Sequence, residues 1–296
     1  MTNPVKSPIK IPTLTRIVKI ASGYHHLVIL TDEGNVLTMG CGENGQLGRL
    51  AERFATRAGR NWERALMRPA IVPIKMASRQ AGRGTDKQNC LTSSSDLNKS
   101  QDSAGHARTA TDIWAGGFAS IVKLESGAVL GFGLNSSSQL GFRSTGATAE
   151  ECCVFQPKFL PTLSALEPRF VSCGHHHTLV LGRDARVYAC GAKEYGACGV
   201  EGEGDVVVSP IEVEALKDVE ASSVAAGIYT SYVVAADGAL WSWGTGTNNA
   251  LGHGDEEDHL TPEKVQAKQL EKRKAVAVVA GGQHCAVLVS IEEMEE

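Results

Sequence analysis

The stretch that decides the fold runs from Gly23 to Gly48 and reads GYHHLVILTDEGNVLTMGCGENGQLG. Two short apolar runs, 27–30 and 36–39, flank the sequence Asp-Glu-Gly at 32–34. Glycine accepts the positive φ of a tight turn, so this pattern is typical of two strands joined as a hairpin. Apolar runs this short, punctuated by glycine, leave no room for helices of ordinary length.

The same skeleton returns along the chain. Its leading glycines are Gly23, Gly116, Gly174, Gly227 and Gly281, at intervals of 93, 58, 53 and 54 residues. One unit therefore occupies about 55 residues, a period that favours a four-stranded propeller blade over a β-solenoid, whose repeats are usually much shorter. The repeat cores lie near 18–48, 113–141, 170–199, 224–252 and 278–290, the last being half a copy.

Composition excludes several classes of protein. With 42% hydrophobic and 21% charged residues, the 296-residue chain has enough apolar content for a core, so neither a disordered nor a fibrous class fits. The longest apolar run, 275–280, is far too short to span a bilayer. The N-terminus has no apolar segment of the secretory kind, so we expect a reducing compartment and free thiols. The net charge of −4 argues against nucleic-acid binding by the whole molecule.

The residue types that carry metal or covalent chemistry are present without the necessary spacing. The eight cysteines contain no C-x-x-C pair, whereas zinc needs about four converging ligands. His175, His176 and His177 are adjacent, and neighbouring residues of a strand point to opposite faces, so the three cannot converge on one ion. Neither a nucleophile elbow nor a P-loop occurs. We expect no metal, no cofactor and no covalent catalysis.

A basic segment interrupts the repeats. Its arginines Arg49, Arg53, Arg57, Arg60, Arg64 and Arg68 are spaced by 4, 4, 3, 4 and 4 residues, which would place them on one side of a helix. Gly59 argues against one continuous helix. Two interpretations stay open: a solvated basic loop, or a docking arm whose guanidinium groups pair with an acidic partner.

Two other segments lack the repeat pattern. Residues 77–111 are rich in Ser, Gln, Asp, Gly and Lys without apolar periodicity, which predicts a disordered insertion. Residues 291–296 form an acidic tail that we expect to be solvated. The remaining chain, within 1–290, is predicted to be one partial β-propeller.

The histidines divide by their position in the repeat. His26, His177 and His284 occupy the fourth position of Gly-x-x-His, and recurrence in successive units indicates a structural hydrogen bond. His25 and His176 occupy the variable third position. There a blade can present a distinct side chain on one rim, and propellers bind partners through such loops.

Several stretches carry a family resemblance. The skeleton Gly-x-x-His, Leu-Thr-x-x-Gly-x-Val and Gly-x-x-x-x-Gly-Gln-Leu-Gly, with stretches 41–60, 192–196, 246–248 and 268–271, resembles the regulator of chromosome condensation family over most of residues 15–290. The resemblance implies an all-β, seven-bladed propeller. It also implies guanine-nucleotide exchange on the small GTPase Ran at chromatin in the nucleus, with histones as a second partner and neither a membrane nor a small-molecule substrate.

The resemblance also assigns roles to residues. Arg49, Arg57 and Arg60, together with His25 and His175, would contact Ran, and His176 would serve the exchange step. Arg60, Arg64 and Arg68 would contact the acidic surface of the nucleosome. Two positions depart from the family: His25 replaces an acidic residue and Ser138 replaces a histidine before Gln-Leu-Gly. Both departures weaken the case for intact exchange.

The length of the chain raises an alternative. Seven units need about 380 residues, so 296 residues hold about four and a half blades. We expect the chain to begin partway through the ring, without the family's wedge insertion upstream of Met1, and to be marginally stable alone because open blade edges are exposed. The alternative function is a non-catalytic propeller scaffold that binds chromatin or other proteins.

Overall fold

The computed structural model describes residues 16–49, 69–74, 109–149 and 151–290. In these ranges the regular elements are strands, apart from the short helix α3 (Pro161–Ala165) and the single 3-10 turns η1 (Glu194–Gly196), η2 (Glu214–Leu216), η3 (Thr247–Asn249) and η4 (Lys268–Leu270). None of the described helices has the length and apolar character needed to cross a bilayer. The predicted all-β propeller architecture is confirmed.

Each blade is an antiparallel sheet whose strands pair in chain order. Blade 1 consists of β1 (Ile17–Ser22), β2 (His26–Thr31), β3 (Val36–Gly40) and β4 (Ala70–Ile71). Blade 2 consists of β5 (Ala110–Gly116), β6 (Ala119–Leu124), β7 (Val129–Leu134) and β8 (Cys153–Phe159). Blade 3 consists of β9 (Phe170–Cys173), β10 (His177–Leu181), β11 (Val187–Ala192) and β12 (Val206–Glu212). Blade 4 consists of β13 (Ala221–Ala226), β14 (Thr230–Ala235), β15 (Leu240–Gly244) and β16 (His259–Lys264), and the two-stranded blade 5 of β17 (Ala275–Ala280) and β18 (Cys285–Val289).

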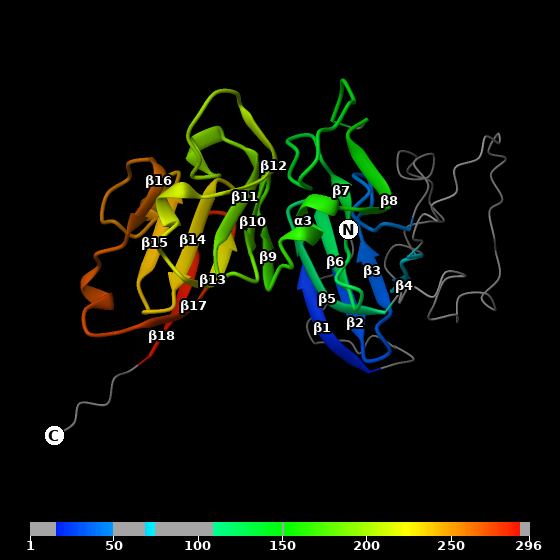
Figure 1. Ribbon diagram of the computed structural model, residues 1–296, viewed down its shortest axis with the longest axis horizontal. Coiled ribbons are helices and arrows are strands. Elements are labelled where there is room, and N and C mark those ends of the chain that lie inside the picture. The colour runs from blue at the N-terminus through cyan, green and yellow to red at the C-terminus, as the bar shows by residue number, and fades with distance from the viewer. Residues whose placement is uncertain (1–15, 50–68, 75–108, 150, 291–296) are drawn as a thin grey trace, which may run out of the picture.

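Figure 1 shows the blades following one another from the blue blade 1 on one side of the molecule to the orange and red blades 4 and 5 on the other. The first strand of each blade contacts the first strand of the next, from β1 through β5, β9 and β13 to β17, so these strands form the inner rim. Because strands alternate in direction, the loops after the first and third strands of every blade lie at the same end of the molecule. We call this end the loop face.

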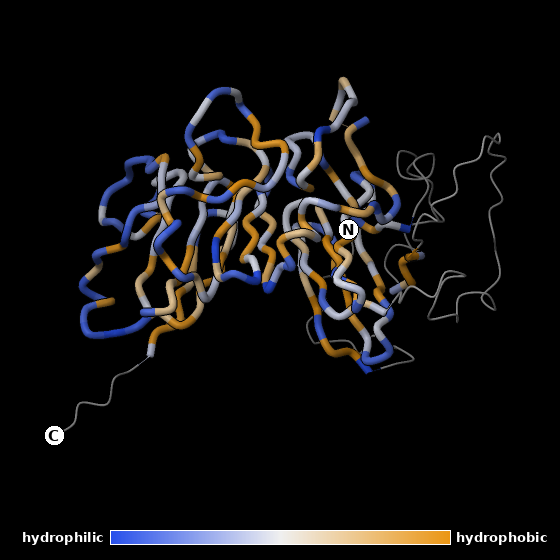
Figure 2. Tube along the Cα trace, in the orientation of Figure 1, coloured by the Kyte–Doolittle hydropathy of each residue, from blue (hydrophilic) through white to orange (hydrophobic). Residues whose placement is uncertain are grey.

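Apolar side chains hold the blades together. Four buried clusters each combine residues from two consecutive blades, as with Val28 of blade 1 and Ile113 of blade 2, or Leu179 of blade 3 and Val233 of blade 4. Figure 2 shows hydrophobic strands and mostly hydrophilic connecting loops. Val, Ile and Leu dominate these strands because branched side chains pack well on a pleated surface.

One hydrogen bond recurs at every blade interface. We call the loop after the first strand of a blade its first loop, which contains the Gly-x-x-His positions, and the loop after the third strand its third loop. The residue that follows the fourth of these positions donates to a carbonyl oxygen in the third loop of the preceding blade. The four pairs are Ser120 to Gln46 O at 2.9 Å, Thr178 to Gln139 O at 2.7 Å, Ser231 to Ala197 O at 2.7 Å, and Cys285 to Ala250 O at 3.8 Å. This bond attaches the first loop of each blade to the third loop of the preceding blade.

The structural role predicted for the fourth-position histidines is confirmed at two of them. His177 Nε2 lies 2.8 Å from Ser231 Oγ, and His26 Nε2 lies 2.8 Å from Ser120 Oγ. Each serine gives its single proton to a carbonyl oxygen, so the imidazole Nε2–H is the donor. His284, on blade 5, is exposed.

Three predicted segments fall largely outside the described residues. The basic segment is described only up to residue 49 and from residue 69 onward, and the acidic tail 291–296 is not described. Of the predicted insertion 77–111 only the last three residues are described, and Ala110 and Thr111 already belong to β5.

Candidate functional site

Glycines shape the loops of the loop face. The leading glycine of each first loop lies where a side chain has no room: a Cβ on Gly174 would lie 2.4 Å from the carbonyl oxygen of Gly227 and 2.7 Å from the His177 ring. Such contacts are well inside van der Waals distance. The glycine therefore lets the first loop pack against both its own histidine and the next blade.

A second glycine packs closely against the backbone of the third-position residue of the same loop. Gly191, the residue before the last of β11, has φ +119°, and a Cβ there would lie 2.3 Å from the carbonyl oxygen of His176. The amide of Ala192 donates to that oxygen at 2.9 Å. The arrangement repeats at Gly40, Gly133 and Gly244 against the third-position residues His25, Phe118 and Tyr229. The backbone of each third-position residue is thus fixed.

The four third-position side chains, with two second-position neighbours and one ring from a third loop, form a continuous aromatic arc across blades 1 to 4. Neighbouring ring centroids are separated by 6.1 Å for His25 and Phe118, 5.7 Å for Tyr24 and Phe118, 5.5 Å for Phe118 and His175, 4.0 Å for His175 and His176, 6.2 Å for His176 and Tyr229, and 4.8 Å for Tyr229 and Tyr195. Tyr24 and Tyr195 are 41% and 46% exposed, so the arc offers ring surface to a partner. We call these seven residues the aromatic arc.

His175 and His176 lie differently from the expectation that adjacent histidines point to opposite faces. Their rings stack with an interplanar angle of 29°. Strand alternation does not apply to them, because β10 begins only at His177 and both residues precede it in the loop. His177 alone turns into the blade interface, where it meets Ser231.

Burial controls the charge of this pair. It lowers the pKa of His175, and the neighbouring His176 lowers that pKa further. Burial also lowers the pKa of His176, although the charge of Glu194 acts in the opposite direction. Ser137 Oγ, from the third loop of blade 2, lies 3.4 Å from His176 Nδ1. Neutral imidazoles can both donate and accept hydrogen bonds, which suits a contact surface for a protein.

Tyr195 carries backbone strain. It lies in η1 with φ 53° and ψ 24°, the left-handed region, which costs a residue with a side chain about 1 kcal/mol or more. Asn248 adopts the same conformation in blade 4, but asparagine tolerates it better. A strained, half-exposed aromatic residue at the end of the aromatic arc is a candidate contact residue.

Arg49 is the one arginine of the predicted partner-binding set that the described residues include. It follows the third loop of blade 1, is partly buried, and its Nε donates to Thr38 Oγ1 at 3.1 Å. Burial lowers the pKa of its guanidinium. Arg57, Arg60, Arg64 and Arg68 lie outside the described residues. The structure thus brings His25, His175 and His176 together in the aromatic arc.

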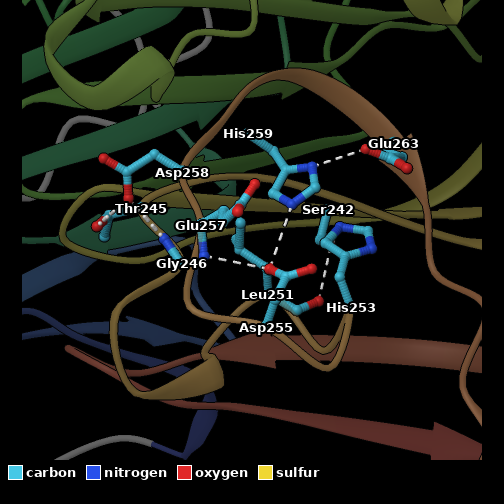
Figure 3. Close-up of polar contacts among 10 residues, drawn as sticks. All are labelled: Ser242, Thr245, Gly246, Leu251, His253, Asp255, Glu257, Asp258, His259 and Glu263. Carbon is cyan, nitrogen blue, oxygen red and sulfur yellow. Dashed lines mark hydrogen bonds and ion pairs between the residues drawn. The ribbon is translucent and has the colours of Figure 1, made fainter.

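A separate polar cluster occupies the third loop of blade 4 (Figure 3). The rings of His253 and His259 stack at 4.3 Å, and His259 Nδ1 lies 2.7 Å from Glu263 Oε2. His253 Nε2 lies 3.0 Å from Ser242 Oγ, and Asp255 Oδ1 lies 3.6 Å from His259 Nε2. Over the described ranges, no group of three or more His, Cys, Asp or Glu side chains is arranged to hold a metal ion. The contacts of this cluster are made within its own blade and order the loop.

Sequence reasoning missed four members of the arc: Tyr24, Phe118, Tyr229 and Tyr195. Phe118 and Tyr229 hold the third position already noted for His25 and His176, so aligning the blades would have found them. Tyr24 holds the second position, next to His25. Tyr195 comes from a third loop, and its contact with Tyr229 depends on how two blades pack.

Comparison with known proteins shows which family and which proteins the chain resembles. Residues 1–287 match the RCC1-like domain family. The chain is 37% identical over 289 residues to the human protein Regulator of chromosome condensation, covering 97% of this chain and 61% of that protein. It is 26% identical over 295 residues to Guanine nucleotide exchange factor SRM1 of Saccharomyces cerevisiae, covering 94% of this chain and 52% of that protein.

A solved structure shares the fold. The crystal structure of Prp20p from Saccharomyces cerevisiae, described with its binding properties to Gsp1p and histones, superposes with a TM-score of 0.76 at 23% identity. The match covers 98% of this chain and 60% of Prp20p. The chain likewise spans 59% and 61% of the Xenopus laevis and human proteins named Regulator of chromosome condensation.

Proposed function

Because this chain belongs to the RCC1-like domain family, we propose that it serves as a guanine-nucleotide exchange factor for the small GTPase Ran, acting at chromatin in the nucleus. A relative named for guanine-nucleotide exchange and relatives named for chromosome condensation support the proposal. The observation that carries it is the aromatic arc, a rigid row of exposed and half-buried rings on the loop face.

Exchange needs no covalent chemistry. A GTPase can hold its nucleotide with picomolar affinity, about 16 kcal/mol, so release is slow unless another protein stabilises the empty state. The exchange factor accelerates release to the extent that it binds the empty GTPase more tightly than the loaded one, and incoming nucleotide displaces it by the same coupling. Preformed loops lower the conformational cost of that binding.

The roles proposed for the residues follow their positions. His176 lies near the middle of the arc, its backbone fixed by Gly191 and its ring stacked on His175. We assign the exchange step to His176 and contacts with the GTPase to His25 and His175. Arg49, Arg57 and Arg60 are proposed as further contacts, from the sequence resemblance alone.

The test is release of labelled GDP from Ran in the presence of the chain. We expect His176→Ala to slow release about tenfold or more, because a ring near the centre of an interface is a candidate hot spot. Arg183→Ala is the matched control: Arg183 lies in the same blade, in the turn after β10 at the end opposite the loop face, and its side chain is 76% exposed. Equal rates for His176→Ala and the unmodified chain would remove the assignment.

The alternative is a scaffold that binds chromatin without exchanging nucleotide, and the spacing of the basic segment favours it. Arg60, Arg64 and Arg68 are proposed to pair with the acidic surface of the nucleosome. Replacing all three by alanine should weaken nucleosome binding and its salt dependence. Nucleosome binding without any effect on GDP release would favour the scaffold.

A further inference from the structure

One end of the aromatic arc combines rings with an acid. Glu194 and Tyr195 are consecutive residues of η1, both exposed, and Tyr195 lies against Tyr229 with an interplanar angle of 56°. Burial lowers the pKa of His176 and raises the pKa of Tyr229, and the negative charge of Glu194 acts upward on both, so its carboxylate lies within electrostatic range of the two rings. Rings from the first loops of two blades and a carboxylate from a third loop therefore meet at one place.

Among the described residues, no cationic side chain pairs with the Glu194 carboxylate. Over the part of the chain that the structure describes, the Glu194 carboxylate has no ion-pair or hydrogen-bond partner. The adjacent Lys193 is turned away: its Nζ lies 3.3, 2.9 and 3.5 Å from the carbonyl oxygens of Glu201, Gly202 and Glu203. Lys193 is therefore next to Glu194 in the sequence, but its ammonium group binds carbonyl oxygens of the loop instead of the Glu194 carboxylate.

The backbone of Tyr195, the residue after this acid, is strained. Tyr195 keeps the left-handed backbone conformation and leaves 46% of its surface exposed. Packing into the core does not explain a strained aromatic residue that is this exposed. Strain of this kind clusters at binding sites, because the fold maintains it to place a side chain.

Two tilted aromatic faces beside a carboxylate match the chemistry of a guanidinium group. A guanidinium is planar, stacks on aromatic rings, and pairs with a carboxylate through parallel hydrogen bonds. From this geometry we infer that Tyr195, Tyr229 and Glu194 form a receptor for an arginine side chain of the partner protein. The inference deepens the proposed function and rests on it for the identity of that partner.

The receptor is tested first without any partner protein. The full chain, labelled with ¹³C in its five tyrosines, is titrated with N-acetyl-arginine amide and followed by NMR. We expect the ring signals of Tyr195 and Tyr229 to move saturably, while the signal of Tyr188, near the opposite end of blade 3, stays in place. Tyr195→Phe and Tyr229→Phe assign the signals. The neutral analogue N-acetyl-citrulline amide has nearly the same shape and should cause no comparable shift.

Glu194→Gln removes the charge and keeps the shape of an exposed residue, so folding should be unaffected. It should weaken binding of the arginine amide about threefold or more, as expected for one exposed charge pair. Equal shifts with the citrulline amide, or equal affinity for Glu194→Gln, would overturn the receptor.

The second measurement is the affinity of the chain for nucleotide-free Ran. Glu194→Gln and Tyr195→Ala should each weaken it about tenfold, whereas Glu203→Gln, an exposed acid in the same third loop, should not. Unchanged affinity in both variants would show that Ran does not use the receptor and would overturn the inference. If the unmodified chain does not bind Ran at all, the proposed function fails, and the arginine titration still decides the receptor.

Discussion

Lowering the pH should destabilise this protein through two buried histidines. Burial lowers the pKa of both His26 and His177 to about 4, while an unfolded chain has a histidine pKa near 6.5. Each group's folded pKa is depressed, and the proton binds more tightly to the unfolded state. The stability that each neutral imidazole contributes is therefore fully present above pH 6.5 and is lost as the pH falls toward 4.

The size of the effect follows from the two pKa values. At about pH 5 the unfolded histidine is almost fully protonated, whereas the folded one is still almost neutral. The difference of about 1.5 pH units at about 1.4 kcal/mol per unit gives about 2 kcal/mol for each histidine. The two together should remove about 4 kcal/mol, a large share of the stability of a typical domain.

Urea unfolding followed by tryptophan fluorescence measures this loss, because Trp243 is fully buried between blades 3 and 4. His177→Gln and His26→Gln keep a donor for the serine hydroxyl and remove the titration. Whatever the stability of the variants at pH 7.5, the double variant should lose about 4 kcal/mol less than the unmodified chain between about pH 7.5 and pH 5. His25→Gln, an exposed neighbour of His26, is the control. A double variant as acid-sensitive as the unmodified chain would refute the reasoning.

Two further predictions concern the repeated loops. Ser231→Ala leaves the His177 Nε2 and the Ala197 carbonyl oxygen without the serine partner at the interface of blades 3 and 4, and should lower the free energy of unfolding in urea by about 2–4 kcal/mol. The control, Ser222→Ala, changes an exposed serine and should cost about 0.5 kcal/mol or less. Similar losses in the two variants would contradict the role of Ser231. Ala185 has φ 62° in a turn where blades 1, 2 and 4 have glycine with positive φ, so Ala185→Gly should raise the free energy of unfolding by about 1 kcal/mol; a loss of stability would mean that the turn is not strained.

The sequence was sufficient to predict the blades because each repeat carries its own turns. The spacing from Gly23 to Gly281, with an apolar run on each side of every turn, reflects local geometry that each unit repeats. The fourth-position histidines could likewise be predicted to be structural from their recurrence. Their partners could not: Ser120 lies 94 residues from His26 and Ser231 lies 54 residues from His177, and nothing local marks those serines as acceptors.

The site was predictable only in outline. The third position identified His25 and His176 as rim residues, because that position varies between repeats. The arc itself arises when first loops of successive blades come side by side, which depends on how the blades pack. The stacking of His175 on His176 could not be predicted from strand alternation, because both residues lie in a loop before β10 begins.

The recurring bond from one blade's first loop to the previous blade's third loop has a consequence for how such a chain can change. These bonds all lie at the loop face, whereas each fourth strand ends, and the next first strand begins, at the far end. In the sequence, residues 72–109 separate β4 from β5, yet Ser120 donates to the Gln46 carbonyl oxygen as Ser231 donates to that of Ala197. Sequence can thus be inserted between the fourth strand of one blade and the first strand of the next while the loop face keeps its geometry.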